Sequence, residues 1–495
     1  MFRDRAWWFA LGAIVSVAMA ARLLLVFAGP DTESDAYAHH VIARRVILEP
    51  WNPQVHWVWL PLFHWLSALA VRLGGTMDTV RFANAIGSAV AAVAVAFQVQ
   101  WARDHGATRT SDGLEIPWVP CLAGTLVAWH PWLNVIGATA QNEALFLALL
   151  SLLPTALARN ESRDESRDAS QPRAHEFARP RTWCAALLVT ALAMLRYEGW
   201  AVLLGLGIGA ISPWRSRLFG PAPWLRAALI LAPAAVVLLA WSYLRVRSGE
   251  APFAYLHGTH QFVQDARHDH LTLVEAGRKL PYYVVQLPYM SFGIPFVFAV
   301  IGIVPLARAL GPAFVVPYVS CLVFVSATWM VGGQLGLLRH FVSVVPLYAA
   351  AMALGVAQVS QLLRDARFGI GLGAIVMGIE GKKLYDSVAH ERAVVASAWP
   401  DRSAVVQAVR ALPKGSRVVC DEPTIEVLAG LPLEDTKRWV ASDPHFEEWV
   451  NDYARGGPVW LAIVRSRLVN PGAFGSPIVT SQDGRYALFR VEAKP

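Results

Sequence analysis

Charged side chains are scarce in this chain. Only 16% of its 495 residues are Asp, Glu, Lys or Arg, against roughly 25% in a typical soluble domain. Apolar residues reach 55%, and apolar runs recur from Trp7 to around Leu384. Many of these runs have about 17–25 residues, enough to span a hydrocarbon core. This distribution excludes a series of soluble domains, which length alone would allow.

Cysteine is also rare. Three of the four cysteines, Cys121, Cys184 and Cys321, lie inside apolar runs, and Cys420 is alone in the hydrophilic tail. The tail therefore has no internal disulfide. It also lacks a nucleotide-binding glycine motif. The net charge of +7 lies largely in short loops between apolar runs, where it indicates membrane orientation rather than binding to nucleic acid.

The apolar runs predict a polytopic α-helical membrane protein with about 11–12 hydrophobic segments. The first run lacks a small-residue cleavage site and is long, which favours a retained anchor over a signal peptide. The segment 57–73 is short and contains Pro61 and His64, so we expect it to lie along the surface or re-enter. The predicted segments are 7–27, 57–73, 79–101, 118–138, 140–157, 183–195, 197–211, 227–246, 283–307, 312–330, 341–358 and 369–385.

Basic residues predict the orientation of these segments. The loop 159–181 contains six arginines, and we expect it in the cytoplasm together with the N-terminus and the segments 213–226 and 361–368. The loops 28–56 and 248–280 then lie on the external side, as does the tail. This arrangement requires one of the three segments between residues 57 and 138 not to span.

The tail, residues 386–495, is expected to form a small external α/β domain, following a transmembrane domain at residues 1–385. Helical and strand-like patterns alternate along it. The predicted helices are 401–412, 424–431 and 444–454, and the predicted strands are 417–420, 459–464, 478–481 and 486–491, the last two joined by Asp483-Gly484.

Ionisable residues near a membrane are the first candidates for a functional site, because burying one costs about 2.5–3.5 kcal/mol at a helix centre. The loop after the first span is rich in acidic residues and histidines between Asp31 and His40. Asp35, His39 and Arg44 follow at helical intervals, so one face would present a carboxylate, an imidazole and a cation. That carboxylate would suit a general base. A solvated acidic loop is the alternative.

Two further pairs of polar residues lie at predicted external turns. Asn142-Glu143 separates two apolar segments, and Arg196 and Glu198 lie between two others. A helix cap at Glu143 and an interfacial ion pair between Arg196 and Glu198 are the alternatives to a functional role.

A third pair, Arg339-His340, precedes the apolar segment 341–358. Arginine is suited to holding a phosphate, and the alternative is an arginine that snorkels at a helix start. The histidines His268 and His270 in the loop 248–280 lack a carboxylate pattern that would specify a metal, so zinc is not expected.

Taken together, these features resemble the GT-C glycosyltransferases, membrane enzymes that use polyprenyl-phosphate sugars. Within this superfamily, the order of the motifs is most similar to that of the branch that contains the protein mannosyltransferases and the lipid A aminoarabinose transferases. The resemblance covers residues 7–385 and rests on the order and spacing of motifs that are not specific singly. These motifs are Ser34-Asp35-Ala36-Tyr37, Trp59 to Trp65, Arg81-Phe-Ala-Asn84, Gln141-Asn142-Glu143, Arg196 to Trp200, and Arg339-His340 leading to Pro346.

The resemblance implies roles for individual residues. Asp35 matches the catalytic carboxylate of the first external loop, Glu143 an acidic residue of the second, and Arg339 an arginine near the lipid phosphate. Many relatives have Asp-Glu where this chain has Asp35-Ala36, which leaves open whether Glu33 assists. The predicted catalytic residues are Asp35 and Glu143, and the predicted substrate-binding residues are Glu33, His39, Arg196, Glu198, Arg339 and His340.

The predicted function is transfer of a hexose or pentose from a polyprenyl-phosphate carrier to a lipid, glycan or protein acceptor on the external face, with inversion at the anomeric carbon. Magnesium or manganese at Asp35 would suit a carboxylate, although nothing in the sequence requires a metal. Membrane lipids are the other expected partners, and nucleic acid is not.

Two other classes of function remain open. A transporter or flippase is expected to show inverted repeats and broken helices, and no such repeat is found. A non-catalytic component of envelope assembly would keep the fold, and Ala36 is compatible with it. The composition, rich in Ala, Arg and Trp, is typical of a GC-rich bacterial genome. In a bacterium the protein would lie in the inner membrane, and its external side would be the periplasm.

Overall fold

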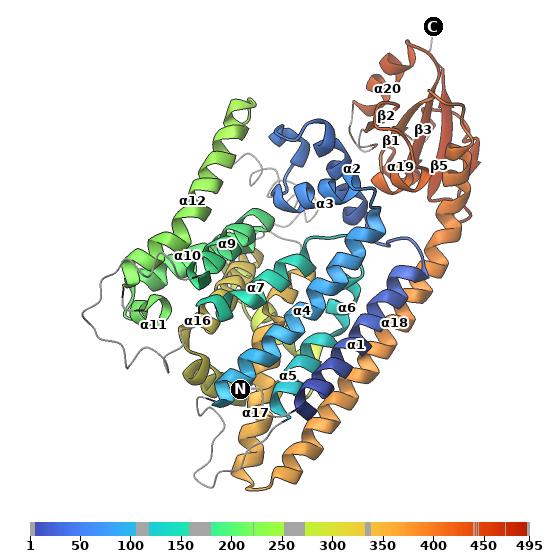
Figure 1. Ribbon diagram of the computed structural model, residues 1–495. Coiled ribbons are helices and arrows are strands. Elements are labelled where there is room, and N and C mark those ends of the chain that lie inside the picture. The colour runs from blue at the N-terminus through green and yellow to red at the C-terminus, as the bar shows by residue number, and fades with distance from the viewer. Residues whose placement is uncertain are drawn as a thin grey trace.

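The structure is a computed structural model of the chain. It describes residues 5–104, 118–157, 180–220, 222–251, 273–331, 338–438, 441, 443, 445–470 and 472–492. Figure 1 shows a bundle of helices with a small sheet-containing domain at one end, reached by the long helix α18 (Ala366–Arg410) beside α1 (Arg5–Ala28). Most of the predicted loops 159–181 and 248–280, including His268 and His270, lie outside the described residues.

Among the described residues, five helices are long and apolar enough to cross a membrane, or six if the bent pair α5 and α6 forms one span. Four shorter apolar helices accompany them. These helices confirm the predicted polytopic helical fold. The bundle also contains α2 (Ser34–Leu48), α3 (Leu62–Arg72), α4 (Met77–Asp104), α5 (Val119–Ala128), α6 (Pro131–Gly137), α7 (Glu143–Leu157), α9 (Pro180–Leu195), α10 (Tyr197–Ile211), α11 (Arg215–Phe219), α12 (Pro223–Arg247), α14 (Leu273–Lys279), α15 (Leu287–Phe292), α16 (Phe296–Met330) and α17 (Val345–Leu362), with the turns η1 (Pro53–His56), η3 (Tyr282–Gln286) and η4 (Leu338–Val344).

Proline and glycine interrupt two of the apolar segments. The segment 118–138 bends by 56° between α5 and α6, where Pro131 cannot donate a backbone hydrogen bond. Helix α16 breaks at Gly311, which has φ 64° and ψ −170°. Glycine adopts such a conformation readily, and Pro312 follows it. The break gives α16 two arms, in agreement with the two segments predicted on either side of it.

The first external segment lies at the same end of the bundle as the C-terminal domain (Figure 1). Helix α3 has only 11 residues, which at 1.5 Å per residue are too few to cross a bilayer. This length agrees with the prediction that 57–73 does not span. Arg44 of α2 donates a hydrogen bond of 2.7 Å to the carbonyl of Leu431, so the first segment and the C-terminal domain are in direct contact.

Helices α16 and α17 pack at very short range through two glycines. A Cβ atom on Gly302 would lie 1.8 Å from the carbonyl oxygen of Ala351, and one on Gly355 would lie 1.9 Å from that of Phe298. Small residues at such crossings replace the hydrophobic driving force that is missing between helices in lipid. This contact orders the helix that follows η4.

The C-terminal domain is a five-stranded sheet of order β2-β1-β3-β5-β4. Its strands are β1 (Arg417–Cys420), β2 (Thr436–Arg438), β3 (Val459–Val464), β4 (Val479–Thr480) and β5 (Tyr486–Val491), and its helices are α19 (Pro423–Ala429) and α20 (Phe446–Ala454). β1 is parallel to both β2 and β3, whereas β5 is antiparallel to β3 and β4.

The α/β character predicted for the tail is confirmed, and β2 is an additional strand. The predicted domain boundary at residue 385 falls inside α18, which continues as one helix to Arg410. The last turns of α18 bury Val405, Val406 and Val409 against the sheet. The bundle and the domain are therefore connected by a continuous helix rather than by a linker.

Candidate active site

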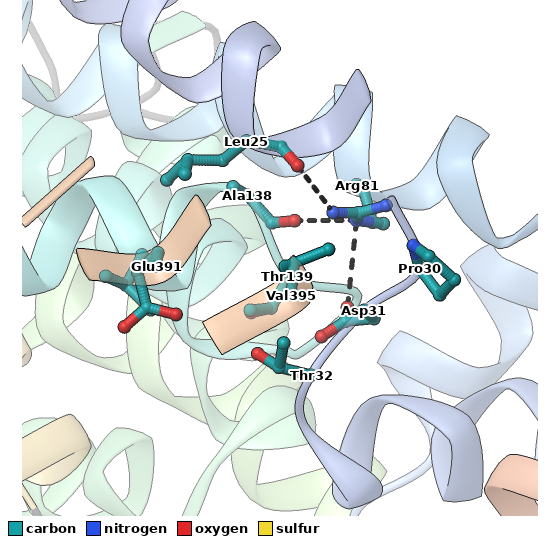
Figure 2. Close-up of a pocket in the computed structure, with 10 residues that line it drawn as sticks. Leu25, Pro30, Asp31, Thr32, Arg81, Ala138, Thr139, Glu391 and Val395 are labelled. Carbon is teal, nitrogen blue, oxygen red and sulfur yellow. Dashed lines mark hydrogen bonds and ion pairs between the residues drawn. The ribbon is translucent and has the colours of Figure 1, made fainter. Parts of the chain in front are cut away.

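The loop between α1 and α2 is fixed at its base by Arg81 of α4. Arg81 Nε donates to the carbonyl of Ala138 at 2.7 Å, and its Nη atoms donate to the carbonyls of Leu25, Val26 and Gly29 at 3.2, 3.1 and 2.9 Å. Leu25 and Val26 belong to the last turn of α1, whose carbonyls have no partner within the helix. Arg81 therefore caps α1 and joins it to the turn before α7 (Figure 2).

Asp31 completes this anchor. Its carboxylate accepts hydrogen bonds from the backbone N–H of Glu33 at 3.0 Å and of Ala140 at 2.8 Å, and lies 3.8 Å from Arg81 Nε. Burial raises the pKa of Asp31, and the charge of Arg81 opposes that shift. Asp31 and Arg81 line a small pocket together with Val395 of α18 (Figure 2). These contacts fix the backbone between α1 and α2 at Asp31.

Asp35 and Arg339 form an ion pair in front of this anchor. Asp35 lies in the first turn of α2, Arg339 lies in η4, and Nη1 of Arg339 is 2.5 Å from the carboxylate. The two side chains are 34% and 29% exposed, so a ligand can reach both. Among the described residues, none bonds to Nη2 of Arg339, which leaves part of the guanidinium available.

Glu143 lies behind this pair at the start of α7. Its side chain is 4% exposed, and Oε1 is 2.6 Å from Nη1 of Arg196 and 3.9 Å from Nε of Arg339. The helix N-terminus favours a negative charge at this position. Glu143 therefore joins the two arginines.

Arg196 is the centre of the buried part of the cluster. It donates to Glu198 from Nε at 3.2 Å and from Nη2 at 2.7 Å, and to Asn142 from Nη1 at 3.0 Å. Nη1 also reaches Glu143, and Nη2 lies 3.1 Å from Nδ1 of His340. A guanidinium has five N–H bonds. Carboxylate and amide oxygens accept four of those of Arg196, and the fifth faces Nδ1 of His340, which also lies 3.4 Å from Glu198.

Glu33 and His39 lie at the edge of the cluster. No direct bond joins Glu33 to an arginine among the described residues. Burial raises the pKa of Glu33, and the charge of Arg339 counteracts that shift. His39 turns its Nδ1 toward Nε2 of His64, at 2.8 Å. The structure thus brings six of the eight predicted site residues into direct contact and places the other two beside them.

Carboxylates outnumber cations in this cluster. The four carboxylates are those of Glu33, Asp35, Glu143 and Glu198, and the two guanidinium groups are those of Arg196 and Arg339. Among the described residues no group of three His, Cys, Asp or Glu side chains has the geometry of a metal site. A magnesium or manganese ion at Asp35 would therefore take its remaining ligands from substrate and water. It would also compete with Arg339 for the same carboxylate.

The sequence interpretation assigned no role to several residues that build the site. Asn84 donates to the carbonyls of Thr139 and Gln141 at 2.7 and 2.6 Å and so shapes the turn into α7. Arg81 and Asn84 were recognised as a motif, and their i,i+3 spacing places them on one helix face. His64 was recognised as part of the motif from Trp59 to Trp65, and His56 was not singled out; their contact with each other and that of His64 with His39 depend on how α2, η1 and α3 pack.

Comparisons with known proteins identify the fold. No protein-family model and no curated protein match the sequence. ArnT from Cupriavidus metallidurans bound to undecaprenyl phosphate superposes with a TM-score of 0.65, at 14% identity over 99% of this chain and 100% of ArnT. The apo form of ArnT gives 0.61, at 14% identity over 98% of each chain. AglB from Archaeoglobus fulgidus gives 0.49, at 13% identity over 91% of this chain and 69% of its own.

The chain therefore has the fold of ArnT along its whole length, including the C-terminal domain. The architecture implied by the resemblance to GT-C proteins is confirmed by this likeness. At 14% identity, the comparison concerns the fold.

Proposed function

We propose that this chain is a membrane glycosyltransferase that moves a sugar from a polyprenyl-phosphate carrier to an acceptor. One observation carries the proposal. Asp35 and Arg339 are paired at the accessible edge of a buried charge cluster, in a fold shared with a protein whose structure contains undecaprenyl phosphate. Transfer from a phosphate-linked donor needs a base for the acceptor and a cation for the leaving phosphate.

Arg339 is proposed to bind the phosphate of the lipid carrier. Its Nη1 atom pairs with Asp35, whereas Nη2 has no partner among the described residues and the side chain is 29% exposed. Negative charge grows on the phosphate oxygens as the sugar leaves. A guanidinium already held in place by neighbouring carboxylates stabilises that charge without reorganising.

Asp35 is proposed to accept the proton of the acceptor hydroxyl or amine. The acceptor oxygen or nitrogen forms a bond to the anomeric carbon while the bond from that carbon to the phosphate oxygen breaks. The electron pair leaves with polyprenyl phosphate, and the proton goes to Asp35. A single displacement of this kind inverts the configuration at the anomeric carbon. Protonation also removes the charge that Arg339 was paired with, so the guanidinium becomes free for the phosphate.

The other charged residues are proposed to support these two. The N–H groups of Arg196 are directed at Glu143, Glu198, Asn142 and His340, so we place it and Glu198 behind the reacting groups as positioning residues. Glu143 links Arg196 to Arg339 and sets the orientation of the second guanidinium. Glu33, His39 and His340 are placed as contacts for sugar and acceptor oxygens.

We further infer that the N-terminus is cytoplasmic and that Asp35 and the C-terminal domain lie on the external side of the membrane, the inner membrane in a bacterium. The arginine-rich loop 159–181 supports this orientation. The acceptor on that face would be a lipid, a glycan or a protein.

In this proposal, Arg339 supplies the positive charge that a divalent metal would otherwise bring to the leaving phosphate.

The test uses full-length protein reconstituted in liposomes with a panel of radiolabelled polyprenyl-phosphate sugars and crude membrane acceptors. We expect release of free polyprenyl phosphate with one donor class, and a rate about 10²–10⁴-fold lower in Asp35→Asn. Glu49→Gln, an exposed carboxylate at the end of the same helix α2, is the matched control. Movement of labelled lipid across the bilayer without release would assign the chain to transport instead.

A further inference from the structure

Three buried histidines form a hydrogen-bonded chain beside the charge cluster. Nδ1 of His39 lies 2.8 Å from Nε2 of His64, and Nδ1 of His64 lies 2.8 Å from Nδ1 of His56. They come from α2, α3 and η1 and are 4%, 0% and 0% exposed. The rings of Trp59 and Trp241 contact the two ends of the chain. Water is therefore excluded from the middle of the chain.

The three imidazoles are neutral at neutral pH. Burial lowers the pKa of His39 to about 4 and that of His56 to about 3, and it lowers the pKa of His64 well below its ordinary value. A group with a pKa of about 4 is a weak base at pH 7. His39 is therefore better suited to donating a hydrogen bond than to removing a proton.

A chain of neutral histidines has a single direction. Each neutral imidazole has one N–H and one lone pair, and both nitrogens of His64 are engaged. If His56 donates to His64, then His64 donates to His39 and the free N–H of the chain is at Nε2 of His39. If the direction is reversed, Nε2 of His39 carries a lone pair and the free N–H is at Nε2 of His56.

The charges at the two ends select the first direction. His39 is in the field of the carboxylates of Glu143 and Asp35, which attract an N–H, and of the cations Arg339 and Arg196, which have a smaller effect. His56 is in the field of Arg245, whose positive charge disfavours an N–H at that end. Nε2 of His56 is buried and has no hydrogen-bond partner among the described residues. Neither an N–H nor a lone pair would have a partner there, so the positive charge of Arg245 decides between them and favours the lone pair.

We propose that this chain fixes His39 as the Nε2–H tautomer, so that His39 donates a hydrogen bond to an oxygen of the lipid-linked donor next to Asp35. His64 and His56 are positioning residues, since they act through His39. That the acceptor of this hydrogen bond is an oxygen of a lipid-linked donor rests on the proposed function. The tautomer is a property of the free protein and does not depend on any substrate.

The tautomer is measured directly by nitrogen NMR of the full chain, labelled at histidine and kept in nanodiscs, with His39→Asn used to assign the His39 signals. We expect protonated Nε2 and unprotonated Nδ1 at His39 from pH 6 to 8. His64→Gln retains an N–H that can donate to His39, and we expect it to keep this tautomer. His64→Leu, of similar size but without a donor, should give a mixture.

Turnover provides the second readout. We expect His64→Leu to lower kcat/KM for the lipid-linked donor by about tenfold, the loss of one substrate hydrogen bond, and His64→Gln to restore most of it. Equal thermal midpoints of the two variants exclude a difference in folding. A protonated Nδ1 at His39 in the wild type would overturn the proposal, as would a His64→Leu variant with unchanged tautomer and turnover. Failure of the proposed function would show as a lack of turnover in wild type, and the NMR result would still decide the tautomer.

Discussion

At the scale of the residue, Arg339 differs from Arg196 in what its neighbours leave free. Four N–H groups of Arg196 are bound by two carboxylates and an amide and the fifth faces His340, whereas Arg339 makes one short ion pair, to Asp35, and is partly exposed. Two arginines of the same cluster thus differ in how much of the guanidinium is left for a ligand, which is the basis of the different roles proposed for them. The distinction depends on counting donors, because both side chains are always charged.

This difference predicts the effect of substitution at Arg339. Arg339→Lys keeps the charge but loses the planar fork, so it cannot hold Asp35 and a phosphate together. We expect the Kd for undecaprenyl phosphate to rise about tenfold in Arg339→Lys and about 100-fold in Arg339→Met. Binding to detergent-solubilised protein measures it, and Arg72→Lys, an exposed arginine at the end of α3, is the control. Undiminished binding by Arg339→Met would show that the phosphate binds elsewhere.

The site residues could be predicted by type and by approximate location, but of their pairings only the local one between Arg196 and Glu198 could be, since the others join distant segments. Glu143, Arg196 and Arg339 were singled out because ionisable residues beside or within apolar segments are costly to bury, and the resemblance to GT-C proteins implied roles for Glu143 and Arg339. That Glu143 would lie between the two arginines depends on how three loops fold together. The inward turn of His39 was not predictable either, since its partner His64 belongs to a segment that read as a short apolar helix.

At the scale of the element, the contact between α16 and α17 determines where η4 lies, and η4 carries Arg339. The contact depends on Gly302 and Gly355, whose missing side chains allow the two backbones to meet. Helices in lipid gain their association from such close packing rather than from hydrophobic burial. We therefore expect the position of Arg339 to depend on these two glycines.

We expect Gly355→Ala to destabilise the protein by about 1–3 kcal/mol, because the added methyl would meet the backbone of α16 and force the helices apart. Gly371→Ala in α18 is the matched control, since nothing lies within 4 Å of its added carbon and Ala is the better helix former. Thermal unfolding in detergent compares the two variants. A midpoint for Gly355→Ala equal to or above that of Gly371→Ala would contradict this account of the contact.

Helix positions were largely predictable, whereas helix continuity was not. Apolar length predicts a span, but the bend before Pro131 and the break at Gly311 depend on local backbone conformation. The extension of α18 beyond residue 385 was missed because charged residues there end the apolar run without ending the helix. Helical propensity and tertiary packing against the sheet continue it to Arg410.

At the scale of the whole molecule, one end of the bundle gathers segments from almost the entire chain. α2, the turn before α7, the start of α10 and η4 converge there, and the C-terminal domain lies against α2 (Figure 1). The basic residues of the loops already predicted that these segments share a side of the membrane, provided that one of the three segments between residues 57 and 138 does not span. This prediction could not show that they touch, because positive-inside arguments give a side and not a distance.

The central claim is that Asp35 and Arg339, 304 residues apart, act as one catalytic unit. A double-mutant cycle tests it most directly, with kcat/KM for polyprenyl-phosphate release measured in wild type, Asp35→Asn, Arg339→Met and the double variant. We predict that each single change lowers the rate by at least about 100-fold and that the double variant is no slower than the worse single one. Losses that multiply in the double variant would show that the two residues act independently, and single variants with wild-type rates would contradict the proposed site.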